Sequence, residues 1–218
     1  MAVHGGADIV NDGLKLCVDG ASKNCYPGSG TTVTDLSNGK SGTMSGVTHS
    51  DNTFLFDASG EDIDFASNAD FAYGTSFTYE YWIKPSSIGT YAAIIDPRTS
   101  GEMLAPSIWI GTTSGYKYYI WINNTRVINH DTDWQTNQWQ YGATVYNGST
   151  MKLYYGLSEV ASTSYSSTMI QSKVRIGNHY NDQYPFSGNI SIVRAYNKAL
   201  SLTELTQNYN AQRGRFGV

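Results

Sequence analysis

The densest run of carboxylates in the sequence is Glu61-Asp62-Ile63-Asp64-Phe65. In an extended strand, successive side chains point to opposite faces, so Asp62 and Asp64 share one face while Glu61 points to the other. Acid–base catalysis needs side chains within reach of one reacting group. We therefore interpret this run as loop carboxylates or structural metal ligands rather than as a catalytic pair.

Other signatures of catalysis are absent from the sequence. It contains no Gly-x-Ser-x-Gly and no His-Glu-x-x-His motif. Two cysteines, Cys17 and Cys25, are interpreted as unpaired thiols, with a disulfide as the alternative, because a disulfide needs a Cα separation that sequence cannot test. The histidines are scattered through predicted loops and are expected at the surface: His4, His49, His130 and His179. The sequence therefore predicts a protein that is not an enzyme.

Two predicted loops combine aromatic rings with amides and carboxylates. They are 130–137, His-Asp-Thr-Asp-Trp-Gln-Thr-Asn, and 178–184, Asn-His-Tyr-Asn-Asp-Gln-Tyr. Loops on a rigid scaffold are where binding residues concentrate. The alternative is that their rings simply pack over the end of the domain. Four further tryptophans fall in predicted strands and are expected in the core or on a sheet face: Trp82, Trp109, Trp121 and Trp139.

The elements that must position these loops are short strands. About a dozen apolar or alternating runs recur between turn signals rich in Gly, Asn and Ser, a pattern typical of a sandwich or jelly roll. In 77–84, alternation places Phe77 and every second residue on a packing face and leaves the other face mixed. Asn147-Gly148 predicts a hairpin. Residues 24–50 are expected to form a long loop or two short edge strands. Ser201 and Glu204 form a capping box that predicts one helix over 202–211.

Composition supports one all-β domain over residues 1–218. Hydrophobic residues make up 40% and charged residues 15%, with 17 Tyr and 5 Trp, and Tyr and Trp favour strands. The net charge is −4, and no Lys/Arg stripe is present, so nucleic acid is not an expected partner. No run of about 18 apolar residues suggests membrane insertion. The first residues do not resemble a signal peptide, so synthesis in a cytoplasm is expected.

Several segments resemble one known family. The closing segment 186–201, Phe-Ser-Gly-Asn-Ile-Ser-Ile-Val-Arg-Ala-Tyr-Asn-Lys-Ala-Leu-Ser, with Glu204 after it, resembles the last strand and short helix of the laminin-G-like, concanavalin-A-like lectin–glucanase superfamily. Phe54-Leu55-Phe56-Asp57 with Ile63-Asp64 is similar to another segment of that superfamily, and 77–85 is similar to its Trp-bearing strand. The resemblance implies a two-sheet antiparallel jelly-roll sandwich with one short C-terminal helix.

A narrower subgroup is suggested by the two ends of the chain. Residues 13–19, 26–32 and 35–37, together with 208–217, resemble a subgroup common among tailed-phage virion structural proteins. This implies a capsid-decoration, fibre or tail-associated protein at the virion surface. Its expected partners are other virion proteins or its own copies in a homo-oligomer.

The family resemblance also implies candidate ligands. Glycan binding needs an aromatic platform with amides and carboxylates for the hydroxyls, and the candidate contacts are Trp134, Asp131, Asp133, Asn178, Tyr180, Asp182 and Tyr184. Relatives hold a structural Ca²⁺, for which Asp57 and Glu61 are the candidate ligands here. Ala58 and Ser191 replace two residues of the relatives' site, which weakens it.

The superfamily that this sequence resembles also includes glucanases, whose catalytic carboxylates follow a fixed spacing on one strand. Their Glu-x-Asp-x-x-Glu motif fails here, because the residue three beyond Asp64 is Ser67. The expected function is therefore a non-catalytic virion structural protein that contacts host surface glycans. The alternatives are a soluble carbohydrate-binding module and, more distantly, a glycoside hydrolase.

Overall fold

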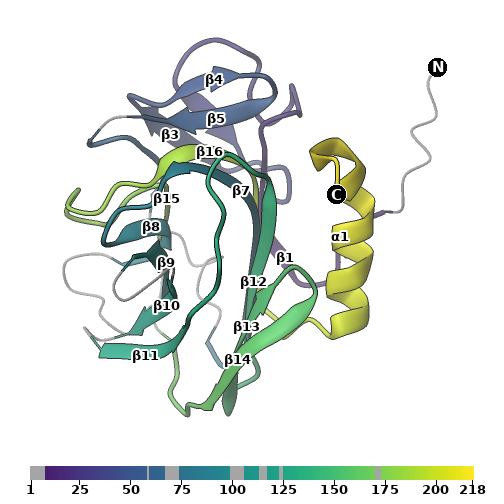
Figure 1. Ribbon diagram of the computed structural model, residues 1–218. Coiled ribbons are helices and arrows are strands. Elements are labelled where there is room, and N and C mark those ends of the chain that lie inside the picture. The colour runs from purple at the N-terminus through teal and green to yellow at the C-terminus, as the bar shows by residue number, and fades with distance from the viewer. Residues whose placement is uncertain are drawn as a thin grey trace.

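The computed structural model describes residues 8–57, 59–66, 74–98, 106–112, 117–122, 125–169 and 173–218. Two antiparallel sheets lie face to face, and the one helix within these residues, α1 (Leu202–Phe216), covers the outer face of one of the sheets (Figure 1). The expected two-sheet jelly-roll sandwich with a C-terminal helix is confirmed. The described residues contain no helix long and apolar enough to cross a membrane.

The first sheet is built around the longest strands. In spatial order its strands are β14 (Ser158–Ser164), β13 (Thr150–Tyr155), β12 (Gln140–Tyr146), β7 (Phe77–Ser87), β16 (Ser187–Tyr196), β5 (Thr53–Phe56) and β4 (Thr48–Ser50). One edge of β16 pairs with β7, while the other edge is shared between β5 and β1 (Leu14–Asp19). Residues 13–19 therefore lie beside the closing strand, far away in sequence.

The second sheet carries the candidate site. Its strands, in spatial order, are β11 (Thr125–His130), β10 (Lys117–Ile122), β9 (Ser107–Gly111), β8 (Ala92–Asp96), β15 (Val174–Ile176), β6 (Asp62–Phe65), β3 (Ser41–Ser45) and β2 (Thr32–Thr34).

Three of the short strands, β2, β3 and β4, lie within residues 24–50. The sequence predicts a long loop or two edge strands for this segment, and both predictions give fewer strands than the structure contains. Their polar sequences show little hydrophobic alternation, and pairing with neighbouring strands defines them.

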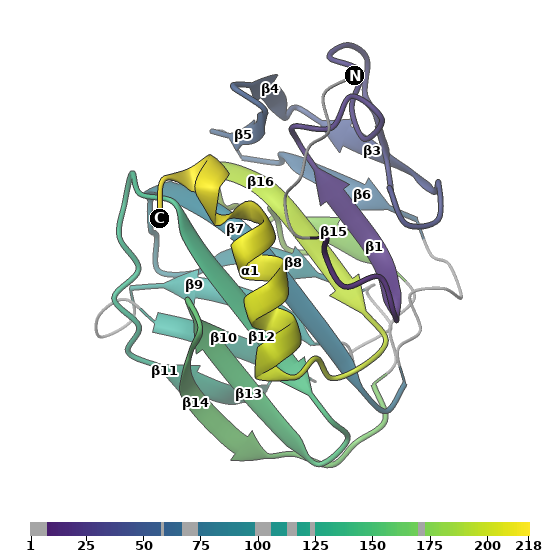
Figure 2. The ribbon, with the colours of Figure 1, turned by 90° about the vertical axis from the view of Figure 1, so that its right-hand side faces the viewer.

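The main core lies between the sheets, and a second one lies beneath α1. The face of β7 that carries Phe77, Tyr79, Tyr81 and Ile83 is fully buried in the main core, as predicted. Most of the opposite face is buried as well, because α1 lies over this side of the first sheet (Figure 2) and its Tyr209 stacks on Trp82. Lys84, on the same face, is half-buried. Alternation predicted the two faces correctly, but it could not show that both would be covered.

The predicted helix begins correctly and ends later than expected. Ser201 is its N-cap, with the capping box to Glu204 formed as predicted. The helix continues to Phe216, where Gly217 adopts a left-handed conformation with φ 72°. Phe216 stacks on Trp82 with ring centroids 4.2 Å apart. This tertiary contact accounts for the extra turn beyond residue 211.

The structure also confirms two local predictions, the Asn147-Gly148 hairpin and the unpaired cysteines. The Asn147-Gly148 turn joins β12 to β13, with Gly148 at φ 94° and the Asn147 side chain accepting two backbone N–H groups. Cys17 and Cys25 are buried free thiols, which confirms the interpretation as unpaired cysteines. Burial raises the pKa of Cys25 to about 12, so its thiol is unreactive at neutral pH.

Candidate functional site

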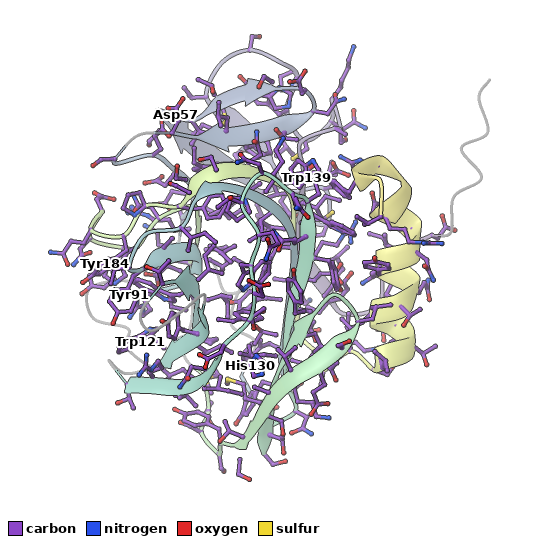
Figure 3. The ribbon with its side chains drawn as sticks, viewed as in Figure 1. Asp57, Tyr91, Trp121, His130, Trp139 and Tyr184 are labelled. Carbon is purple, nitrogen blue, oxygen red and sulfur yellow. The ribbon has the colours of Figure 1, made fainter. Side chains whose placement is uncertain are left out.

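An aromatic pocket opens on the outer face of the second sheet. Its volume is about 270 Å³. Figure 3 shows Tyr91, Trp121 and Tyr184 on the same side of the molecule, facing away from α1. The pocket is lined by Tyr91, Arg98, Trp109, Trp121, His179, Tyr180, Asn181, Gln183 and Tyr184.

Strand alternation builds the base of this aromatic pocket. In β9, Ile108 and Ile110 point into the core, so Trp109 points outward. In β10, Ile120 likewise points inward and Trp121 outward. The outward face of the two strands is therefore aromatic, and the inward face is largely aliphatic.

Tyr91 meets three other rings of the aromatic pocket edge to face. Tyr91 lies 6.2 Å from both Trp109 and Trp121 and 5.8 Å from Tyr184, with interplanar angles of 82° to 86°. Trp109 also lies 5.1 Å from Tyr184. Aromatic pairs prefer such edge-to-face geometry, so the walls of the pocket support one another before any ligand arrives.

A buried ion pair forms the floor of the aromatic pocket. Arg98 donates from Nε and Nη2 to the two oxygens of Asp96, at 2.8 and 3.0 Å. The guanidinium carbon lies 5.7 Å from the centre of the Trp109 ring and 5.5 Å from that of Tyr180. Asp96 also accepts the Tyr180 backbone N–H at 3.1 Å. The pair thus joins the end of β8 to the loop over residues 178–184.

Arg175 on β15 holds that loop from below. Its Nη1 donates to the carbonyls of His179 and Tyr180, at 3.1 and 3.3 Å, and to Asp182 at 2.7 Å. Its Nη2 donates to Asp64 on the neighbouring strand β6. Arg175 therefore fixes the backbone that presents His179, Tyr180 and Tyr184 to the pocket.

Glycine is required where the 178–184 loop leaves β15. Gly177 has φ 86°, a left-handed conformation that side chains disfavour. A Cβ at this position would also overlap the ring of Phe56. The loop can therefore turn sharply out of the sheet and cross the pocket.

His179 is uncharged at neutral pH in this environment. Burial lowers the pKa of its imidazole below the ordinary value of about 6.5, and the nearby Asp96 only partly opposes the shift. The ring packs 5.2 Å from Trp109 and 4.3 Å from Tyr180. His179 therefore contributes a neutral polar edge to an otherwise aromatic wall.

The predicted 178–184 cluster is partly at this pocket. Tyr180 and Tyr184 are half-buried and line it. Asp182 is exposed and paired with Arg175 instead. Asn178 is fully buried, and its side-chain oxygen accepts the His179 N–H at 2.8 Å. The interpretation of Asn178 as a ligand contact is therefore wrong: it braces the loop from inside.

The predicted 130–137 cluster does not form part of the aromatic pocket. Trp134 is fully buried in the main core, where it stacks on Tyr81 and contacts Tyr155 edge to face. The prediction of Trp134 as a sugar platform is wrong, because no face of its ring is open. Asp131 and Asp133 are exposed on the loop after β11, and their role as ligand contacts stays a prediction.

The calcium candidates do not fit a cation site. Asp57 is exposed, whereas Glu61 is buried and accepts the Asp57 backbone N–H at 2.5 Å. Figure 3 places Asp57 in a separate region from the aromatic pocket. In the described part of the chain, no three His, Cys, Asp or Glu side chains gather to hold a metal ion. A hard cation such as Ca²⁺ takes six to eight oxygens, which these two residues do not assemble.

The carboxylates of β6 are engaged in ion pairs. Asp64 lies 2.5 Å from Lys173 and 3.0 Å from Arg175, and Asp62 lies 3.6 Å from Arg175. A retaining glycosidase would need two carboxylates about 5 Å apart across one sugar bond. Asp62 and Asp64 instead support the base of the 178–184 loop.

Sequence reasoning missed much of the pocket. Trp109 and Trp121 were assigned only to the core or a sheet face, and Tyr91 and Arg98 were not singled out. The available signal was the alternation of these tryptophans with core isoleucines in two consecutive strands. That pattern shows an aromatic outer face, but it does not show that a loop 60 to 70 residues further along closes over it.

The fold and pocket together define a lectin-like β-sandwich, a class of non-enzymatic and enzymatic modules built on one scaffold. The family model of the concanavalin A-like lectin/glucanases superfamily matches residues 57–206, so the chain belongs to that superfamily. A comparison with curated protein sequences found no match.

Solved structures share the fold at low sequence identity. Domain 4 of AbnA, a GH43 extracellular arabinanase from Geobacillus stearothermophilus solved in complex with arabinotriose, superposes with a TM-score of 0.70 at 14% identity, covering 91% of this chain and 98% of that one. The binding domain of botulinum neurotoxin serotype D gives 0.68 at 17% identity. Its ligand-binding domain in complex with N-acetylneuraminic acid gives 0.67 at 16%. The match covers 94% of this chain but only 52% of each neurotoxin chain.

Proposed function

We propose that this chain is a non-catalytic carbohydrate-binding module that holds a saccharide in the aromatic pocket of the second sheet. The observation that carries the proposal is the pocket itself, in which tryptophan and tyrosine rings meet the side-chain amides of Asn181 and Gln183. Small-ligand sites combine an apolar lining with a few placed polar groups. A sugar offers a matching pair of surfaces, one of C–H groups and one of hydroxyls.

The charge of the aromatic pocket favours a neutral saccharide. Among its described lining residues there is no acid, and its one cation, Arg98, is matched by the buried carboxylate of Asp96. His179 is uncharged at neutral pH, because burial lowers its pKa. An anionic sugar would lose hydration here without meeting an uncompensated cation.

The experiment is titration of the protein with neutral oligosaccharides, starting with arabinotriose, cellotriose and chitotriose, by calorimetry. Trp121→Ala removes a half-buried ring from the pocket without opening the main core. We expect it to lower the affinity at least about tenfold, or about 1.4 kcal/mol. The control is Tyr165→Ala, which removes a half-buried ring that does not line this pocket.

Loss of binding in both Trp121→Ala and Tyr165→Ala would point to a general defect rather than to this pocket. Equal binding by Trp121→Ala and the wild type would contradict the proposal. A bound product shortened by hydrolysis would instead support the glycoside hydrolase alternative, so the sugars are analysed for cleavage after each titration.

We propose the virion role on the sequence resemblance of residues 13–19, 26–32, 35–37 and 208–217. In this form the chain is one domain at the virion surface, made in the host cytoplasm, and it assembles with its own copies or with other virion proteins. Light scattering of the purified chain tests the self-assembling form. A defined ring or trimer supports it, and a monomer at all concentrations favours the soluble carbohydrate-binding module.

A further inference from the structure

A second cavity lies on the outer face of the first sheet, beside the C-terminal end of α1. Its volume is about 450 Å³. Figure 3 places Trp139 on the α1 side of the molecule, away from Tyr91 and Trp121 of the aromatic pocket. The residues that matter for its chemistry are Asn189 and Ser191 on β16, Lys84 on β7, Trp139 before β12, and Arg215 and Phe216 on α1. We call this cavity the helix-side pocket.

Two aromatic rings form one wall of the helix-side pocket. Trp139 and Phe216 are half-buried, and their ring centroids lie 4.8 Å apart. Phe216 is itself stacked on the buried Trp82. The Trp139 ring is thus held by a neighbour that is fixed to the protein, while part of its surface remains accessible.

Positive charge lies against this aromatic wall. The Lys84 ammonium is 5.6 Å from the centre of the Trp139 ring. The described residues place no carboxylate within ion-pairing distance of Lys84. Lys84 is anchored in the central strand β7, so its charge is directed by a rigid element.

Arg215 provides a second cation at the opposite end of the pocket. Its Nη1 donates to Asp19 at 2.8 Å and its Nη2 to Ser191 at 3.2 Å, while its side chain remains 32% exposed. Its Nη1 also donates to the side-chain oxygen of Gln212 at 3.0 Å. The ion pair with Asp19 uses one carboxylate oxygen, whereas Arg98 pairs with both oxygens of Asp96. Among the described lining residues, Asp51 at the tip of the β4–β5 turn is the one acid. Because Arg215 is paired with Asp19, which is not among these lining residues, Lys84 is the cation of this pocket without a described carboxylate partner.

Neutral polar groups complete the helix-side pocket. The Asn189 amide donates to the Thr53 hydroxyl at 2.9 Å, and the Ser191 hydroxyl donates to the Asn52 carbonyl at 3.4 Å. These contacts fix the direction of both side chains. An aromatic platform, two cations and oriented amides and hydroxyls match a sugar ring that carries a carboxylate.

We propose that the helix-side pocket is a second saccharide site, specific for an acidic sugar whose ring lies on Trp139 and whose carboxylate meets Lys84. This proposal does not depend on the aromatic pocket. The two cavities differ in charge, since the cation of the aromatic pocket has a buried partner and Lys84 has none among the described residues. One chain would then hold a neutral and an acidic sugar on opposite faces.

The test compares two probes that differ only in charge. Hyaluronan tetrasaccharide carries two uronates, about two negative charges at neutral pH, and its carboxyl-reduced form carries none. We expect the acidic probe to bind at least about tenfold more tightly at low salt, and this preference to shrink as salt screens it. Equal binding of the two probes, or binding of neither, would overturn the proposal.

Variants assign the binding to this pocket. We expect Lys84→Gln to lower the affinity for the acidic probe about five- to tenfold and to flatten its salt dependence, with the far-ultraviolet spectrum and Tm showing that the fold is kept. Trp121→Ala should leave this binding unchanged. If Trp121→Ala abolishes it, or Lys84→Gln does not weaken it, the acidic sugar occupies another site and the proposal fails.

Discussion

Asp96 and Arg98 are two residues apart at the end of β8 and form a bidentate ion pair with both side chains almost completely buried. The carboxylate also accepts the backbone N–H of Tyr180, 84 residues away. This pair therefore connects the sheet to the loop that closes the aromatic pocket, and it neutralises the only cation among the described lining residues.

Asp96→Asn tests that connection. It leaves the Arg98 charge buried without its partner, which costs about 3–5 kcal/mol when such a pair is broken. We expect a loss of this size in the free energy of unfolding, measured with urea. Replacing both residues, as Asp96→Asn with Arg98→Gln, should recover part of it. The exposed pair Lys152–Glu159, at 2.8 Å, is the control, and Lys152→Gln should cost less than about 1 kcal/mol.

Asn208 is predicted to fasten α1 to the first sheet. Its amide nitrogen donates to Glu80 and to the Tyr196 hydroxyl, both at 3.0 Å, and its oxygen accepts the Val10 N–H at 2.7 Å. Asn208→Ala removes three buried hydrogen bonds and takes the acceptor from the Val10 N–H, while Glu80 keeps its bonds from Tyr141 and Arg194. We expect it to lower the free energy of unfolding by about 2–4 kcal/mol.

The matched control for Asn208 is Asn210 on the exposed side of the same helix. Asn210→Ala should change the free energy of unfolding by no more than about 0.5 kcal/mol. Alanine favours a helix more than asparagine does, so helix propensity alone would make both variants slightly more stable. Equal effects of the two substitutions would contradict the assignment of the loss to the buried hydrogen bonds of Asn208.

Asp62 should make stability depend on pH. Burial raises the pKa of its carboxyl to about 6, against the lowering effect of Arg175. The unfolded chain has a value near 3.9, so the folded state binds the proton more tightly. The free energy of unfolding contributed by this group is therefore fully present below about pH 4 and is lost as the pH rises through about 6.

Asp62→Asn imitates the protonated carboxyl. We expect it to be more stable than the wild type by about 1–2 kcal/mol near pH 8, with the difference vanishing near pH 4. Asp133→Asn removes the same charge at an exposed position and separates the effect of burial from that of net charge. A difference that is constant across this range would contradict the assignment to Asp62.

Calcium is expected to leave the protein unchanged. In the described part of the chain no third acidic, His or Cys side chain joins Asp57 and Glu61, and Ca²⁺ takes six to eight oxygens. We expect the same Tm with excess Ca²⁺ and with a chelator. A rise in Tm with Ca²⁺ that is lost in Asp57→Asn would establish the metal site and refute this reading.

The two loops show how far the site could be anticipated. Both 130–137 and 178–184 have rings beside amides and carboxylates, and sequence alone could not rank them. In the structure, Trp134 turns into the core beside Tyr81, whereas Tyr184 remains against Trp109 at the surface. The difference comes from the space beneath each loop, which is set by strands distant in sequence.

Sequence by itself determined the longer strands, their faces and the start of the helix. Period-two alternation in β7, β9 and β10, the Asn147-Gly148 turn and the Ser201–Glu204 capping box are local features, because each depends on neighbouring residues and backbone geometry. Tertiary structure alone decided which faces were covered. Packing of α1 buried the mixed face of β7, and the Asp96–Arg98 pair with Arg175 placed the 178–184 loop over Trp109. These contacts join residues far apart in the chain, and such distances are set only when the sheets close on each other.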